Sequence, residues 1–118
     1  MRFAHSRRTF LTAVLLVMVI GKVLAEDRVL EIAIHNAESP ADPPVLSVRQ
    51  NDQVVVHVTS DKPLHVHLHG YDIESDVAPN VVTSLRFTAT ATGSFPFEIH
   101  SNEPRKHRPL AYLEVRPR

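Results

Sequence analysis

The sequence contains no cysteine. Disulfide bonds and a Cys–His catalytic pair are therefore excluded, and burial alone must hold a domain of this chain together. Its two methionines, Met1 and Met18, both lie in the first 25 residues. A metal site anywhere else in the chain must therefore be built from nitrogen and oxygen ligands.

Glycine and surplus charge are scarce as well. Beyond residue 25 the only glycines are Gly70 and Gly93, so no glycine-rich phosphate-binding loop is present. The same part of the chain carries nine basic and 13 acidic side chains, a formal net charge of −4 with neutral histidine. We therefore expect neither nucleic acid nor an anionic membrane as a partner.

The first 25 residues have the pattern of an export signal peptide. Arg7 and Arg8 precede a short apolar run over 13–20, and a cleavage site ends at Ala25. The run is too short for an ordinary transmembrane helix. The arginine pair resembles the twin-arginine signal of bacteria; an ordinary secretory signal and an uncleaved anchor are the alternatives. All three place the domain of residues 26–118 in the periplasm or outside the cell.

Alternating apolar residues predict strands in this domain, and helix signals are nearly absent. The expected strands are Val29–His35, Val45–Arg49, Gln53–Ser60, Leu64–His69, Ile73–Val77, Val81–Thr90, Phe95–His100 and Leu110–Arg116. Seven or eight short strands, spaced by roughly ten residues, predict a single all-β sandwich or barrel. The residues expected in its core are Ile32, Val56, Leu68, Phe87, Phe97 and Val115.

Three histidines alternate with apolar residues in the segment Leu64–Gly70. Residues i, i+2 and i+4 of a strand share one face, so His65, His67 and His69 should point to the same side. Neighbours on that face lie roughly 6.5–7 Å apart, which allows two imidazoles to meet on one metal ion. The other interpretation is a solvent-facing polar strip that binds nothing.

Other residues could complete such a site. Glu98 and His100 share the polar face of a later strand. If that strand lies beside the histidine strand, cross-strand neighbours about 4.5–5.5 Å apart would give a three- or four-ligand site. His107, in a basic loop, is the third candidate. His35 and His57 lie on polar strand faces without an evident partner, and we expect them to be surface residues.

The order of these elements resembles the small bacterial cupredoxin-like domains of the EfeO type, which is found in periplasmic iron-uptake proteins. The resemblance covers about 45–117 and includes the segments Leu64–Asp72 and Gly93–His100. It implies a cupredoxin-like Greek-key β-sandwich for residues 26–118.

In blue-copper relatives, one histidine binds copper together with a later cysteine, histidine and methionine. The first of these matches His65 or His67 here. The cysteine position falls near Ile99–His100 and the methionine position near Pro109–Leu110, but neither residue is present. The thiolate–copper bond of blue-copper electron transfer is therefore missing, and the available ligands favour Cu(II), Ni(II) or Zn(II) over Cu(I).

We therefore expect a periplasmic metal-binding protein without enzymatic activity. Copper(II) is the first candidate metal, and zinc, nickel and iron are alternatives. The candidate metal ligands are His65, His67, His69, His100, His107 and Glu98. Another periplasmic metal-handling protein is an expected partner besides the ion. The alternative functions are a metal-free structural or partner-binding module and an accessory of iron uptake, in which Glu98 and Asp72 would matter more.

If the twin-arginine route carries the chain, export needs both Arg7 and Arg8. Replacing the pair by two lysines should leave the precursor in the cytoplasm, because the route recognises the arginines and not positive charge alone. Cell fractionation of the full chain measures this, with the parent sequence as control. Normal export of the lysine variant would show that the general secretory route is used.

Overall fold

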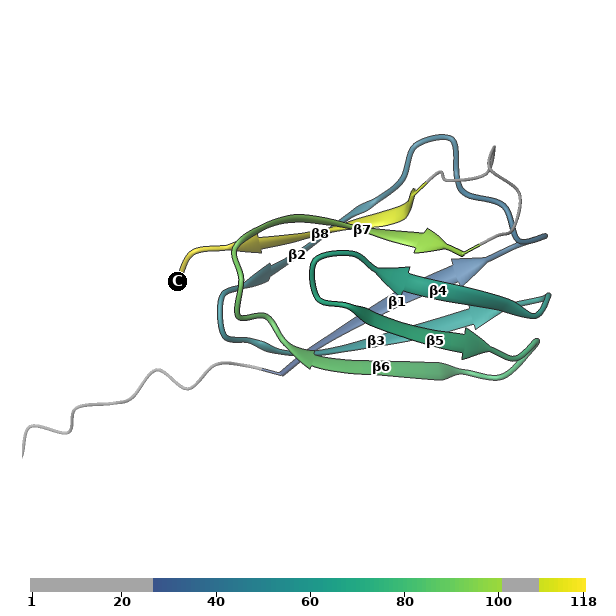
Figure 1. Cartoon of the computed structure of the whole chain (residues 1–118), viewed down its shortest axis with the longest axis horizontal. Helices are drawn as coiled ribbons and strands as arrows, with labels where there is room; N and C mark the ends of the chain where they lie inside the picture. Colours follow the sequence, from purple (N-terminus) through teal and green to yellow (C-terminus); the bar gives the residue numbers. More distant parts are fainter. Residues whose placement is uncertain (1–26, 101–108) are drawn as a thin grey trace, which may run out of the picture.

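Two β-sheets face each other in the computed structural model, which describes residues 27–100 and 109–118 (Figure 1). These residues contain eight strands and no helix, and hence no helix that could cross a membrane. The strands are β1 (Asp27–Ile34), β2 (Val45–Arg49), β3 (Gln53–Ser60), β4 (Leu64–Leu68), β5 (Ile73–Val77), β6 (Thr83–Thr88), β7 (Gly93–Ile99) and β8 (Pro109–Arg116). The all-β prediction is confirmed, and β2, β3 and β5 have the expected bounds.

The smaller sheet has three strands in the order β1-β3-β6, and the larger has five in the order β2-β8-β7-β4-β5. Neighbouring strands are antiparallel, except that β1 runs parallel to β3 and β2 parallel to β8. The chain crosses repeatedly from one sheet to the other, as in a Greek-key sandwich. The strand β4 lies inside the larger sheet, and β5 forms one of its edges.

Apolar side chains from alternate strand positions fill the space between the sheets. The largest fully buried ones are Phe97, Leu68, Leu113, Val54, Val56, Val58, Val66 and Val77. Five of the six residues expected in the core are buried, and Phe87 is the exception. Phe87, near the end of the edge strand β6, is partly buried at the margin of the core, with its ring centroid 5.1 Å from that of Tyr71.

The strand expected over 81–90 proves shorter. Asn80 turns the chain with a φ of 60°, and Val81 and Val82 follow it with 58% and 56% of their surface exposed. Pairing with β3 begins only at Thr83, opposite Val58. The alternation of residue types extends beyond the paired segment, so sequence pattern alone overestimates the length of β6.

A buried carboxylate holds one end of the sandwich together. Asp52, in the turn between β2 and β3, is 1% exposed, and its Oδ2 accepts a hydrogen bond of 2.9 Å from the backbone N–H of Arg49. Its Oδ1 pairs with the guanidinium of Arg118, and Oδ2 lies 3.7 Å from Nε of Arg28. Such pairing is what permits a carboxylate to be buried. Both cationic partners are remote from Asp52 in the chain, so no local sequence pattern predicts this pairing.

The hairpin between β4 and β5 depends on Gly70. Its φ of +88° is a conformation that costs a residue with a side chain roughly 1–2 kcal/mol. A Cβ at this position would also collide with the ring of Phe95, which packs edge-on against Tyr71 with centroids 4.8 Å apart. The turn brings Ile73 opposite Leu68 and so sets the register of the two strands.

Replacing Gly70 with alanine should lower the free energy of unfolding by about 2–4 kcal/mol, because left-handed strain adds to overpacking against Phe95. The matched control is Gly93→Ala. Gly93 also has a positive φ, but a Cβ there would meet Phe95 at an ordinary 3.5 Å. Urea unfolding followed by circular dichroism measures both variants. An equal loss in the two would contradict the importance of the Phe95 contact.

Candidate metal centre

The histidine segment of the sequence forms β4, between β5 and β7. Val66 and Leu68 are buried against the smaller sheet. Because side chains alternate between the two faces of a strand, His65 and His67 lie on the outer face of the larger sheet. His69 follows directly after β4, and its ring centroid lies 4.2 Å from that of His67. The three histidines therefore share one face, as the alternation predicts.

The neighbouring strand β7 supplies two more of the expected residues. Glu98 lies opposite His67, and His100 follows the end of β7. The backbone N–H of His100 donates a hydrogen bond of 2.8 Å to the carbonyl of His65. The ring centroid of His100 lies 6.0 Å from that of His65 and 5.5 Å from that of His67. Imidazoles from both strands are thus close enough to approach one ion.

On its other side β4 pairs with β5, which adds two carboxylates that are not among the ligands expected from the sequence. His65 lies opposite Asp76, and His67 opposite Glu74. Nδ1 of His65 lies 2.8 Å from Oδ1 of Asp76, and Nε2 lies 3.2 Å from Oε2 of Glu74. The alternation within Ile73–Val77 shows that the two acids share one face of their strand. Only the geometry of the hairpin determines that this face is the one that carries His65 and His67.

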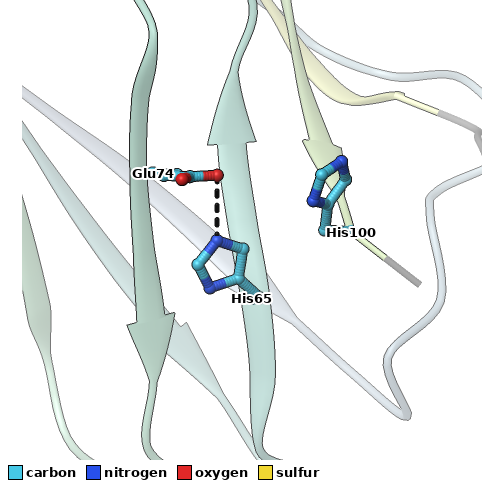
Figure 2. Close-up of side chains that lie close together, drawn as sticks. All are labelled: His65, Glu74 and His100. Carbon is cyan, nitrogen blue, oxygen red and sulfur yellow. Dashed lines mark hydrogen bonds and ion pairs between the residues drawn. The ribbon is translucent and has the colours of Figure 1, made fainter. Parts of the chain in front are cut away.

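Ligand atoms of His65, Glu74 and His100 converge from three adjacent strand segments (Figure 2). One nitrogen or oxygen from each residue lies within 4.8 Å of the other two. Ligands bound about 2.0–2.2 Å from a metal ion are separated from each other by about 3 Å. The Nε2–Oε2 distance of 3.2 Å between His65 and Glu74 has this spacing. His100 is exposed and can approach by side-chain rotation.

The other polar side chains of the face lie beside this group. Nε2 of His69 is 2.7 Å from Oε2 of Glu98, and Nε2 of His67 is 4.0 Å from Oδ1 of Asp72. Nδ1 of His67 is buried and has no hydrogen-bond partner among the described residues. An unsatisfied buried nitrogen costs roughly 1–3 kcal/mol, which a bound ion or water would relieve.

The carboxylates of β5 favour positive charge at this face. The hydrogen bond with Asp76, and after it the one with Glu74, raises the pKa of His65 above its usual 6.5. The hydrogen bond with His65 in turn lowers the pKa of Glu74 below its usual 4.5. A proton or a metal cation at His65 therefore meets the same negative surroundings.

Two other histidines of the described residues, His35 and His57, lie away from this face. The side chain of His35 is 83% exposed and lies 4.0 Å from Asp61. His57 is half-buried on the outer face of the smaller sheet, so it cannot join the cluster. His107 lies outside the described residues, and its role as a ligand stays a prediction.

Solved structures similar to this one are cupredoxin-like domains of copper proteins. The blue copper oxidase from Nitrosomonas europaea matches with a TM-score of 0.62 and 22% identity, over 78% of this chain and 39% of that one. A copper binding protein in its apo form matches with a TM-score of 0.58 and 10% identity, over 75% of this chain and 87% of that one. The periplasmic domain of cytochrome oxidase subunit II (CoxB) of Bradyrhizobium japonicum matches with a TM-score of 0.54 and 15% identity, over 74% of this chain and 82% of that one. The chain thus has a cupredoxin-like β-sandwich fold.

These similarities concern the fold and not the whole proteins. The chain spans 31–42% of four multicopper and blue copper oxidases, and 64% of a chain of a heme-copper terminal oxidase. No protein-family model matches the sequence, and no curated protein matches it significantly. The relationship to the EfeO-type family stays a prediction.

The contact between His65 and Asp76 predicts how the metal-free protein titrates. NMR titration should give His65 a pKa above 6.5, and Asp76→Asn should move that pKa back toward 6.5, because the largest cause of the shift is removed. The exposed Asp42→Asn is the control. A His65 titration that Asp76→Asn leaves unchanged would contradict the assignment.

The same contact has a consequence for stability. A pKa raised by folding stabilises the folded state fully below about pH 6.5, and the contribution is lost as pH rises through the folded-state value. Parent and Asp76→Asn should therefore differ more in unfolding free energy at about pH 6 than at about pH 9. Urea unfolding at both pH values measures this difference.

Proposed function

We propose that this chain binds copper(II), or a similar divalent ion, for storage, delivery or sensing in the periplasm. The observation that carries the proposal is the gathering of four histidines and several carboxylates on the outer face of β5, β4 and β7. The proposed ligands are His65, His67, His69, His100 and Glu98, with His107 as a further candidate.

The donor set fits Cu(II) and does not fit a blue-copper centre. A blue-copper centre needs a thiolate, and the chain has no cysteine. Imidazole and carboxylate ligands suit Cu(II), which stands highest in the affinity order of divalent ions. Nδ1 of His67, which has no hydrogen-bond partner in the part of the chain that the structure describes, also favours a bound ion near the imidazoles.

A role without turnover is supported by the openness of the site. The side chain of Asp76 is 95% exposed and that of Glu74 is 55% exposed. A small-molecule substrate is usually bound in a concave pocket that buries most of its surface. The proposed location is supported by the signal-like N-terminus and by the likeness to a periplasmic domain and to a copper binding protein.

A second candidate function is an accessory role in iron uptake. It is favoured by the carboxylates that flank the histidines, namely Glu74, Asp76, Glu98 and Asp72, because harder ions prefer oxygen ligands. Parallel titrations with Cu(II) and with Fe(II) under anaerobic conditions separate the two candidates. Tighter binding of iron than of copper would support the iron role.

Replacing His67 or His100 with alanine should each weaken Cu(II) binding by at least roughly tenfold, or about 1.4 kcal/mol, because one His-x-His pair leaves an exposed ion half coordinated. The controls are His35→Ala and His57→Ala, which should leave the affinity unchanged. Competition with a chromophoric chelator, on the untagged full chain stripped of metal, measures all four variants.

The same samples have a spectroscopic outcome. Copper-loaded protein should absorb visible light only weakly and give the electron paramagnetic resonance spectrum of a nitrogen-rich tetragonal Cu(II) site. A strong absorption band at about 600 nm would contradict the proposed ligands. If the parent binds no stoichiometric copper, the metal-free module becomes the better interpretation. If the parent binds copper and both alanine variants bind it equally well, the assignment of His67 and His100 as ligands is wrong.

A further inference from the structure

Both nitrogens of the His65 ring face a carboxylate, Asp76 at Nδ1 and Glu74 at Nε2. An ionised carboxylate only accepts hydrogen bonds, and a neutral imidazole has a single N–H. A doubly protonated ring satisfies both contacts together, and so does a cation held between one ring nitrogen and its carboxylate.

The geometry distinguishes the two sides. Asp76 lies directly opposite His65 in the strand pairing, and its oxygen is at the 2.8 Å of a charge-assisted hydrogen bond. Glu74 lies two residues before Asp76 on the same face of β5. Glu74 and His100 belong to the group of converging ligand atoms, whereas Asp76 does not. A proton on Nδ1, held by Asp76, leaves the lone pair of Nε2 on the side of Glu74, whose Oε2 lies 3.2 Å away.

The geometry points to Glu74 as a direct ligand that makes the site select Cu(II) over Cu(I), and to Asp76 as the residue that positions His65 for binding through Nε2. This inference rests on the proposed metal-binding function and assigns to it the ligand atoms, the anionic ligand and the oxidation state. The ion would bridge β5, β4 and the residue that follows β7.

The selectivity follows from the charge and hardness of Glu74. Coulomb attraction between a carboxylate and a divalent ion is twice that for a monovalent ion at the same distance. Cu(I) also prefers thiolate and thioether ligands, and residues 26–118 contain neither cysteine nor methionine. Removing the negative charge of Glu74 should therefore weaken Cu(II) binding much more than Cu(I) binding.

The role of Asp76 is that of a residue acting on a ligand. Histidines that bind metals commonly donate their second N–H to a carboxylate, which fixes the tautomer and the orientation of the ring. Asp76 meets this description at Nδ1 of His65, and at 95% exposure it is not needed for the core. Loss of such a partner typically weakens metal binding by about 10–100-fold.

Glu74→Gln tests the direct ligand, because it keeps the size of the side chain and removes the charge. The matched control is Glu31→Gln, an exposed strand residue of the smaller sheet. Affinities are measured on the untagged full chain stripped of metal, with Cu(II) in air and with Cu(I) under anaerobic reducing conditions. Glu74→Gln should bind Cu(II) at least roughly tenfold more weakly than the parent and Cu(I) less than about threefold more weakly. Glu31→Gln should bind both ions with the parental affinity.

Asp76→Ala and Asp76→Asn test the positioning role. Long-range ¹H–¹⁵N spectra of the metal-free protein, at a pH where His65 is neutral, should show its proton on Nδ1 in the parent. Asp76→Ala should lose this preference and about tenfold in Cu(II) affinity. Asp76→Asn should restore the tautomer and most of the affinity, because its side-chain oxygen accepts the same hydrogen bond.

The outcomes separate this inference from the function on which it rests. A parent chain that binds no copper overturns both. If the parent binds copper but Glu74→Gln binds Cu(II) equally well, or loses Cu(I) to the same extent, the role of Glu74 falls and metal binding stands. If Asp76→Ala, folded by circular dichroism, keeps the parental tautomer and affinity, the positioning role falls.

Discussion

The candidate site depends on the register in which β4 pairs with β5 on one side and β7 on the other. In a strand, a slip of one residue moves every side chain to the opposite face. Here such a slip would expose Val66 and Leu68 and bury imidazoles instead. Burying a large aliphatic side chain is worth roughly 1.5–3 kcal/mol, so the hydrophobic core selects the register that faces the histidines outward. The core therefore determines the arrangement of the site without containing any part of it.

The sequence predicts the faces of single strands but not which faces come together. The period of two was enough to place His65, His67 and His69 on one face, and the shared face of Glu98 and His100 suggested a second strand. Placing Glu74 and Asp76 beside the histidines also requires the geometry of the turn at Gly70, since a hairpin in another register would pair them with other residues of β4. Local pattern predicts faces, whereas the pairing of faces is a property of the folded sheet.

Contacts between remote residues could not be predicted from the sequence at all. Arg28 and Arg118 meet Asp52 only because β1, β8 and the turn between β2 and β3 come together at one end of the sandwich. No spacing rule relates residues so far apart in the chain. Phe87 illustrates the same limit, since its alternation is that of a core residue but it is only partly buried, whereas Leu85 on the same strand is buried. Burial depends on the place of a residue along its strand in the folded sandwich as well as on periodicity.

The fold is shared with copper proteins, yet the chemistry available here differs from that of a thiolate centre. A fold fixes where strands lie, and the residues placed on it decide what is bound. In this chain the polar residues converge on an open sheet face, with an edge strand contributing the carboxylates. An ion bound there would connect β5 to the centre of the sheet, since among the described strands β5 pairs with β4 alone. Binding to the folded state alone stabilises it by about 2.7 kcal/mol when the free ion is at 100 times its dissociation constant. For a domain without disulfides, metal binding and the order of its exposed edge are thus expected to be thermodynamically coupled.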